Sequence, residues 1–386
     1  MSAADLARLQ FALTTSFHFL FVLLTLGLVT LLVIMQTRFA ITGAPVHERM
    51  TRFWGRIYVI NYALGIVTGI VMEFQFGLNW SGLATYAGDV FGAPLAMETL
   101  IAFFLESTFL GLWIFGWGKL NRWVHLALLY LTALTAYASA FWIMAANGFL
   151  QHPVGYRIDG NVLRLDDFSA LLTNPTFNSA LMHVIFASIT AGGVFMTGVS
   201  AYHFIKRTPE IEFFQRSMRL GVITTALATP SLLGAGFAQF PIIAQYQPGK
   251  HSAAPWIGAP LGFMIMIGMT LAAVSWLTLP FLFGTVILRM RPLLYLMVIG
   301  IPLPFTAAIF GWMFREVGRQ PWLVYGLLKT EDAVSHVDAS QILLSLIVFT
   351  SLFILLTVVD WALIARAVRR GPDVAPAPVS PLVVTL

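Results

Sequence analysis

The sequence predicts an all-α membrane protein of about nine transmembrane helices, and three observations support that prediction. Of the 386 residues, 58% are hydrophobic and only 10% are charged, whereas soluble domains are about 25% charged. The mean hydropathy is +0.83. Apolar stretches of about 20 residues, the length that crosses a bilayer, recur along the chain. This composition excludes the soluble enzyme classes, and the absence of cysteine excludes disulfides, Cys-ligated zinc and Cys-bound iron–sulfur clusters.

The first apolar run, 11–35, is too long for a signal-peptide core and is expected to be retained as a helix. Residues 1–370 are expected to form a single transmembrane helical domain that binds haem, and the Pro-rich tail 371–386 is expected to be disordered. No internal repeat is evident, which argues against the inverted-repeat transporter folds. The predicted spans are 13–37, 54–77, 94–117, 123–148, 176–205, 217–243, 259–289, 293–314 and 340–365.

Basic residues orient the predicted spans. Most of the 22 Lys and Arg residues follow spans 1, 3, 5, 7 and 9, at one side of the membrane. Because cytoplasmic loops are enriched in Lys and Arg, the N-terminus is predicted outside and the C-terminus in the cytoplasm. This distribution reflects topology and does not indicate nucleic-acid binding. The few basic residues of the other side are Arg8, Arg157, Arg164, Lys250, Arg315, Arg319 and Lys329.

Two glutamates interrupt the apolar segment 93–109, APLAMETLIAFFLESTF. A carboxylate in hydrocarbon is costly, so such residues usually face a bundle interior and mark ion or proton routes. In an α-helix Glu98 and Glu106 would lie about 12 Å apart along the axis and roughly 80° apart around it. They are therefore predicted to lie at two depths of one pathway. The alternative is that each is a structural glutamate hydrogen-bonded to a neighbouring helix.

Other polar residues are predicted in the same layer, near the outer side of the membrane. His18, Glu73 and His183 lie near the outer ends of their spans, as does Met266. A neutral imidazole is a good iron ligand, and His/Met coordination is a known arrangement for an electron-transfer haem. From the residues alone the chain is predicted to bind a membrane haem or to handle protons. A hydrogen-bonded core histidine and a packing methionine are the more ordinary interpretations of each residue taken singly.

Five longer segments carry a family pattern. They are RLQFALTTSFHFLFVLLTLG (8–27), FWGRIYVINYALGIVTGIVMEFQFGLNW (53–80), GDVFGAPLAMETLIAFFLESTF (88–109), ASAFWIMAANGF (138–149) and GIPLP…GW…GRQPW (300–322). In these segments the chain resembles subunit I of the cytochrome bd-type oxidases. The resemblance implies oxidation of quinol and reduction of O2 to water, with haem b and either haem d or a second haem b near the outer face.

The resemblance also implies roles for individual residues. His18 corresponds to the axial ligand of an active-site haem, and His183 and Met266 to the two axial ligands of a low-spin haem b. Glu98 corresponds to the carboxylate beside the oxygen-binding haem.

Glu106 and Ser139 correspond to proton-pathway positions, so that Glu98, Glu106 and Ser139 form the expected catalytic set. Other motif residues near the haems are Arg8, Gln10, Glu73, Asn147 and Trp322.

Three departures from the family pattern are visible. The loop between spans 6 and 7, 244–258, has only about 15 residues and lacks the family's lysine- and glutamate-bearing motif for quinol. Ile309 occupies the position assigned to a glutamate that binds a second active-site haem, and Ile309 cannot bind iron. Met264 replaces an arginine two residues before the ligating methionine.

The leading hypothesis is subunit I of a short-loop cytochrome bd-type oxidase in the bacterial inner membrane. Its expected partners are a second membrane subunit, quinol or another donor, O2 and lipid. One alternative is a haem-b electron-transfer or sensor protein without oxidase turnover, which Ile309 and the short loop favour. The other alternative is a proton-coupled transporter without a cofactor, which accounts for the glutamates but not for the His and Met residues.

Overall fold

The computed structural model describes residues 1–250 and 255–373. Within those residues nine helices are long and apolar enough to cross a membrane. This confirms the predicted number of spans, and the observed limits agree with the predicted ones to within 13 residues. Most of the predicted disordered tail, 374–386, lies outside the described residues.

The first five spans contain α1 to α7. Their bounds are α1 Ala3–Thr42, α2 Pro45–Asn79, α3 Ser81–Met97, the π-helix η1 Glu98–Phe103, α4 Phe104–Phe115, α5 Arg122–Gln151, α6 Phe168–Leu172 and α7 Pro175–Ile205. Helices α3, η1 and α4 form one continuous span. The last four spans contain α8 Ile211–Phe237, α9 Gln239–Tyr246, η2 Pro255–Ile257, α10 Gly258–Thr278, η3 Leu279–Leu282, α11 Val286–Arg289, α12 Arg291–Ile299, α13 Leu303–Val317, α14 Thr330–Ala333 and α15 Ala339–Arg370.

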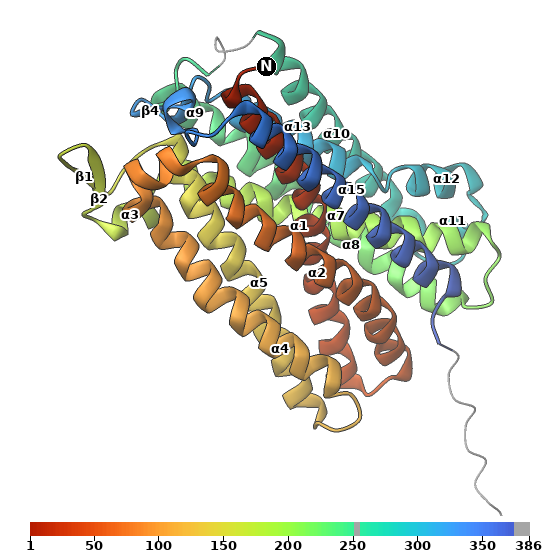
Figure 1. The fold of residues 1–386 in the computed structure, drawn as a ribbon. Helices are drawn as coiled ribbons and strands as arrows, with labels where there is room; N and C mark the ends of the chain where they lie inside the picture. The colour runs from red at the N-terminus through yellow and green to blue at the C-terminus, as the bar shows by residue number, and fades with distance from the viewer. Residues whose placement is uncertain (251–254, 374–386) are drawn as a thin grey trace, which may run out of the picture.

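Two small antiparallel hairpins interrupt the helical pattern at one end of the bundle. They pair β1 Tyr156–Asp159 with β2 Val162–Leu165, and β3 Trp322–Val324 with β4 Leu328–Lys329. Figure 1 shows β1 and β2 projecting from this end. Both lie in connections between spans, so the transmembrane part of the chain is helical throughout.

Two spans differ from uniform helices because of proline. Span 8 is broken into α12 and α13 at Gly300–Pro302, and span 7 ends at Leu282 instead of the predicted 289. Proline lacks a backbone N–H and clashes with the preceding turn, so Pro302 and Pro280 interrupt the α-helical hydrogen bonds. The break in span 8 makes α13 a separate helix, which carries several residues of the functional site.

Helix α1 is the central helix of the bundle and contacts α2, α5, α7 and α15. Its crossing with α7 is very close at two glycines. A Cβ on Gly192 would lie 2.6 Å from the carbonyl carbon of Gly27, and a Cβ on Gly27 would lie 2.2 Å from the Ser188 carbonyl oxygen. Small residues at helix crossings in membranes allow such backbone approach. The crossing sets α1, which carries His18, directly against α7, which carries His183.

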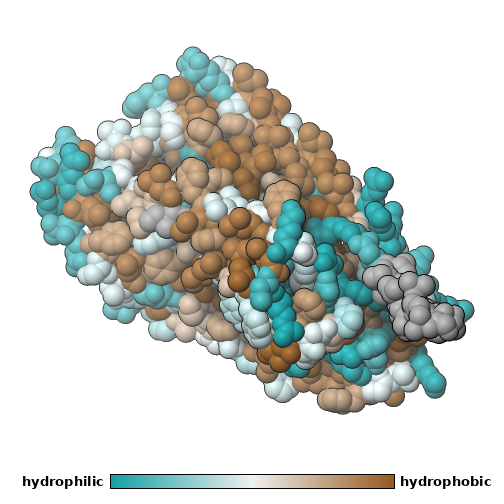
Figure 2. Space-filling model, turned by 90° about the horizontal axis from the view of Figure 1, so that it is seen from below, coloured by the Kyte–Doolittle hydropathy of each residue, from teal (hydrophilic) through white to brown (hydrophobic). Residues whose placement is uncertain are grey.

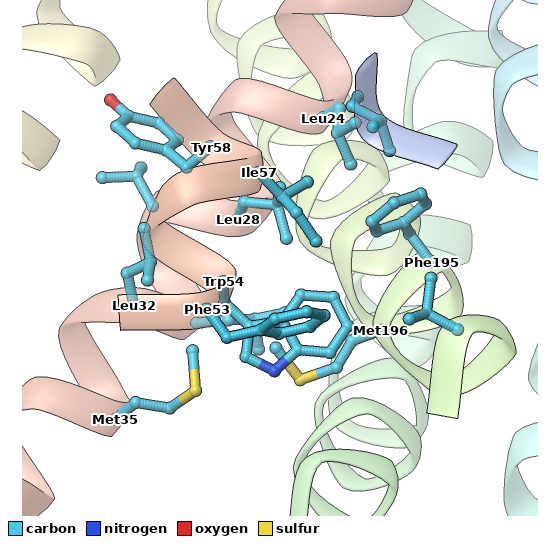
Figure 3. Packing of buried hydrophobic residues seen from close by; sticks show 14 of the residues in the cluster. Leu24, Leu28, Leu32, Met35, Phe53, Trp54, Ile57, Tyr58, Phe195 and Met196 are labelled. Atoms are coloured by element: carbon cyan, nitrogen blue, oxygen red, sulfur yellow. The ribbon is translucent and has the colours of Figure 1, made fainter. Parts of the chain in front are cut away.

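The main hydrophobic core lies where α1, α2, α7 and α8 meet. Figure 3 shows its aromatic centre, in which Trp54 and Phe53 of α2 pack between α1 and Phe195 and Met196 of α7. Trp54 is fully buried, and its indole N–H donates to the hydroxyl of Ser217 at 3.1 Å. The polar atom of this aromatic residue is therefore satisfied inside the apolar core.

The outside of the bundle is strongly apolar. Figure 2 shows a broad hydrophobic surface over the middle of the visible face, with hydrophilic side chains gathered toward its ends. Only 17% of the most hydrophobic stretch of α15 is buried inside the protein. The corresponding share for the span that contains η1 is 18%. A bilayer covers such surfaces, so the chain is a multi-pass membrane protein.

We expect Gly192→Ala to destabilise the protein by about 1–3 kcal/mol, because the added methyl overlaps the backbone of α1. The measurement is thermal unfolding of the detergent-solubilised protein. Gly111→Ala in α4 is the control, since nothing lies within 4 Å of a Cβ there and alanine favours helix more than glycine. Equal melting temperatures for the two variants would contradict the close crossing.

Candidate functional site

A cavity of about 1040 Å³ lies between α1, α2, the η1–α4 span, α5 and α13. We call it the large cavity. It brings together most of the residues that the sequence analysis singled out. Those that line it are Arg8, His18, Glu73, Glu98, Glu106, Ser139 and Asn147. Gln10 and Trp322 do not line it.

His18 is oriented by its neighbour on α2. Its Nδ1 lies 2.9 Å from the hydroxyl oxygen of Thr68, and that hydroxyl donates to the Gly65 carbonyl at 2.7 Å. The single hydroxyl proton is thereby used, so Nδ1 of His18 donates to Thr68. In neutral imidazole the other nitrogen, Nε2, then carries a free lone pair. This arrangement, in which a second group fixes the tautomer, is typical of histidines that bind metals.

Glu98 is held by two hydroxyl groups. Ser139 of α5 donates to its Oε1 at 2.6 Å, and Thr99 lies 3.3 Å from its Oε2. Thr99 also contacts Glu73 of α2, with its hydroxyl 2.7 Å from Oε1 of that residue. Three helical segments therefore meet at one carboxylate pair, which lines the large cavity.

The π-helix η1 begins at Glu98 and changes how the two glutamates face. In a regular α-helix Glu98 and Glu106 would be offset by roughly 80° around the axis. A π turn contains one extra residue and so removes roughly 100° of rotation, which brings the two to within roughly 20°. Both carboxylates line the large cavity, at different depths. Glu106 is 6% exposed and lies in the apolar helix α4.

A polar network at the end of α13 was not predicted. Glu316 lines the large cavity, and its Oε1 accepts from Asn147 at 3.0 Å and from Gln151 at 3.1 Å. Its Oε2 is paired with Arg319, which is 2% exposed. The Nε of Arg315 donates to the Asn147 amide oxygen at 2.6 Å. Asn147 of α5, which the sequence analysis singled out, therefore belongs to the ionic network at the end of α13.

A second cavity of about 150 Å³, the small cavity, lies between α7, α8, α10 and α13. His183 lines it, and its Nδ1 lies 3.1 Å from the Leu232 carbonyl, which can only accept. Nδ1 therefore donates, and Nε2 is left with a free lone pair, as in His18. Both predicted histidines thus have the same tautomer and an available Nε2.

The structure does not bring Met266 to His183. Met266 is 54% exposed on α10 and lines neither cavity, whereas Met264 lines the small cavity. Residues two apart on an α-helix point about 200° apart, so only one of the two can face a given cavity. Packing of α10 against α13 decides which one does. In this structure the thioether beside His183 belongs to Met264.

Two glycines allow these side chains to pack closely against the neighbouring helices. A Cβ on Gly236 would lie 3.1 Å from Cε1 and Nδ1 of His183, and a Cβ on Gly311 would lie 2.6 Å from the Met264 sulfur. An imidazole and a thioether on the walls of one cavity are the donors of a haem held by His and Met. In the large cavity the volume and the available Nε2 of His18 fit a haem as well.

Four residues line both cavities: Phe19, Met144, Val184 and Trp312. Phe19 of α1 and Trp312 of α13 are stacked, with ring centroids 5.7 Å apart and an interplanar angle of 26°. Both rings line the large cavity and the small cavity. The cavities are therefore neighbours separated by aromatic rings, and not two remote sites.

The regions in which the chain departs from the family pattern can now be placed. Ile309 lines neither cavity, and the carboxylate that α13 supplies to the large cavity is Glu316. Lys250 of the short loop is 2% exposed and lines the small cavity. Burial lowers the pKa of its amine well below the usual value, and Arg315 lowers it further. The sequence signals for these residues are the position of Glu316 in REVGRQPW and the lone lysine of the loop.

The family model "Cytochrome bd terminal oxidase subunit I" matches residues 6–259 and 260–372, and the two matches meet beside the short loop. Cytochrome bd ubiquinol oxidase subunit 1 of Bacillus subtilis is 35% identical over 97% of this chain and 95% of its own length. Cytochrome bd-II ubiquinol oxidase subunit 1 of Escherichia coli is 47% identical over 64% of this chain and 49% of its own length. The fold is that of the bd oxidase structure from Geobacillus thermodenitrificans, with a TM-score of 0.89, 24% identity, and coverage of 96% of this chain and 99% of that one.

The buried network around Glu316 gives a prediction. Arg319→Met should destabilise the protein by about 3–5 kcal/mol, because it leaves a buried carboxylate without its ion-pair partner. Thermal unfolding measures the loss. Arg164→Met is the matched control: its 3.7 Å pair with Asp159 is half-exposed on the β1–β2 hairpin, and such pairs contribute about 0–1 kcal/mol. A loss no larger than that of the control would show that Arg319 is not needed to hold Glu316.

Proposed function

The chain belongs to the cytochrome bd terminal oxidase subunit I family and is subunit I of a cytochrome bd-type quinol:O2 oxidoreductase; within this activity, we propose that O2 is reduced at the large cavity and that electrons enter at the small cavity. The observation that carries the proposal is the pair of histidines. His18 and His183 each use Nδ1 for a hydrogen bond within the bundle and leave Nε2 available, one in each of two adjoining cavities.

We propose that His18 holds a haem in the large cavity and that His183 and Met264 hold a low-spin haem b at the small cavity. When bound, haem supplies one-electron carriage and an iron at which O2 is reduced. The histidines bind iron through Nε2, and the Thr68 hydroxyl and the Leu232 carbonyl keep the rings in place. Haem d or a second haem b in the large cavity accompanies the low-spin haem b in this proposal.

Reduction of one O2 to two water molecules consumes four electrons and four protons, and two quinols supply the electrons as they become quinones. Protons must therefore reach the large cavity through apolar helices. We assign this task to Glu106 and Glu98, which line the cavity at two depths. The Ser139 hydroxyl, 2.6 Å from Glu98, orients that carboxyl and can pass on a proton. The acids line the large cavity, which supports its assignment as the site of reduction.

The proposed arrangement includes partners and a location. A second membrane subunit, subunit II of the oxidase, covers part of the exposed apolar surface, and the membrane is the bacterial inner membrane. Quinol binds at the end of the bundle that carries Lys250 and the short loop. The two relatives named ubiquinol oxidase support quinol as the donor.

The decisive experiment uses the purified protein with its partner subunit. We expect reduced-minus-oxidised bands of a low-spin haem b, a species that binds CO, and quinol-driven O2 uptake. In Glu98→Gln we expect the low-spin band to persist and O2 uptake to fall about 100-fold or more, because proton delivery is impaired. Glu331→Gln is the control, because Glu331 is an exposed residue of α14 whose carboxylate lies 3.7 Å from Lys329.

Two results would overturn this function. A single low-spin haem with no CO-binding species would indicate the electron-transfer or sensor protein. Unchanged visible absorbance in His183→Ala would indicate a transporter without a cofactor.

The identity of the second haem ligand can be tested with a pair of variants. Met264→Leu should abolish the low-spin spectrum or convert it to high spin, because the thioether beside His183 is lost. Met266→Leu, two residues along the same helix, should leave the spectrum unchanged, since the Met266 side chain is 54% exposed and lines neither cavity. The opposite result, with the low-spin band lost only in Met266→Leu, would assign the ligand to Met266.

A further inference from the structure

The wall of the small cavity that faces α13 carries two cationic residues, Arg315 and Lys250. The Nε of Arg315 donates to Asn147, but its Nη2 is buried and has no hydrogen-bond partner among the described residues. A buried guanidinium nitrogen without a partner is unfavourable. Such a group on a cavity wall indicates a ligand with an acceptor oxygen.

The charges around this wall do not balance. Glu316 is the carboxylate of the network, and its oxygens are engaged by Asn147, Gln151 and Arg319. Lys250 donates to the side chains of Gln151 and Gln247 and to the Arg315 carbonyl, all of which are neutral. Among the described residues, neither Arg315 nor Lys250 therefore has an anionic partner of its own. Buried charges are stable when they are paired, so this wall is built to receive an anion.

Arg315 is the stronger of the two anion-binding groups. Burial and the neighbouring Arg315 lower the pKa of the Lys250 amine, so this amine holds its proton less firmly than an exposed lysine does. A guanidinium keeps its charge in proteins and presents a planar fork that matches a carboxylate. The fixed positive charge on the cavity wall is thus that of Arg315.

The anion is identified by what else lines the small cavity. His183 and Met264 are the proposed haem ligands there, and a haem carries two propionate carboxylates. Position 264, where the resemblance leads one to expect an arginine, holds a thioether in this chain, and the guanidinium on the same cavity comes from α13 instead. Resting on the proposed function, we propose that Arg315 binds a propionate carboxylate of the haem held by His183 and raises the reduction potential of that haem.

The effect on potential follows from electrostatics. Reduction adds one negative charge to the haem, and a nearby fixed cation in a medium of low dielectric stabilises the reduced form. Arg315 also neutralises the propionate, whose negative charge would otherwise oppose reduction. Both effects act in the same direction, so removing the cation lowers the reduction potential.

The test is a redox titration of the low-spin haem b in the assembled oxidase. In Arg315→Gln, which keeps an amide donor and loses the charge, we expect the ratio of reduced to oxidised haem at a fixed potential to fall about tenfold, or about 59 mV for a one-electron couple. Arg315→Lys keeps the charge and should shift the ratio less. Arg216→Gln is the control, because Arg216 is half-exposed and paired with Glu212 in the first turns of α8.

The outcomes separate this inference from the proposed function. A wild-type protein without a low-spin haem would refute the proposed function itself. A low-spin haem whose potential is the same in wild type and Arg315→Gln would leave that function intact and overturn the role of Arg315. If Arg315→Gln does not assemble, Arg315→Lys decides: a potential shifted downward by loss of the bidentate contact supports the role, and a wild-type potential refutes it.

Discussion

A charged group inside an apolar helix bundle is stable only when other groups in the bundle satisfy it, and the site of this protein is built under that constraint. Glu316 is the clearest case. One carboxylate receives hydrogen bonds from two amides and an ion pair from Arg319, and the groups come from α5, α13 and the turn that follows α13. Because the partners come from α5 and from the turn after α13, the network also fixes how these parts meet. The ends of both cavities depend on it.

The two histidines obey the same constraint in a simpler way. Each is half-buried among apolar helices, where a neutral imidazole is favoured and one nitrogen needs an acceptor. Thr68 provides it for His18, and the Leu232 carbonyl provides it for His183. Satisfying one nitrogen leaves the other as a free base directed by the fold. The requirement that buried polar groups be bonded thus also prepares each histidine to bind iron.

The two cavities differ in charge, and this difference matches the division of tasks in an oxidase. The large cavity contains Glu73, Glu98 and Glu106, which suit it to handling protons. The small cavity has Arg315 and Lys250 on its wall, which suit it to an electron carrier with anionic side chains. Phe19 and Trp312, whose rings are stacked, are the aromatic residues that line both cavities. Carboxylates therefore line the large cavity and not the small one, whereas cationic residues line both, with Arg8 and Arg319 in the large cavity.

The sequence by itself determined the nine spans, the interior position of Glu98 and Glu106, the position of His18 and His183 within apolar spans, and the family. Span length and hydropathy are local properties, and a carboxylate or histidine in an apolar run is visible wherever its helix packs. The tertiary structure decided which way side chains face. Met264, and not Met266, faces the small cavity, and a π turn aligns Glu98 with Glu106. The acid that α13 contributes to the large cavity is Glu316, whereas position 309 holds an isoleucine that lines neither cavity. Glu316 and its arginines looked like charges at the end of a span, because only the packing of α5 against α13 shows that they are buried together. Helix rotation and ion pairing between distant segments arise from the packing of neighbours, which hydropathy along one helix does not encode.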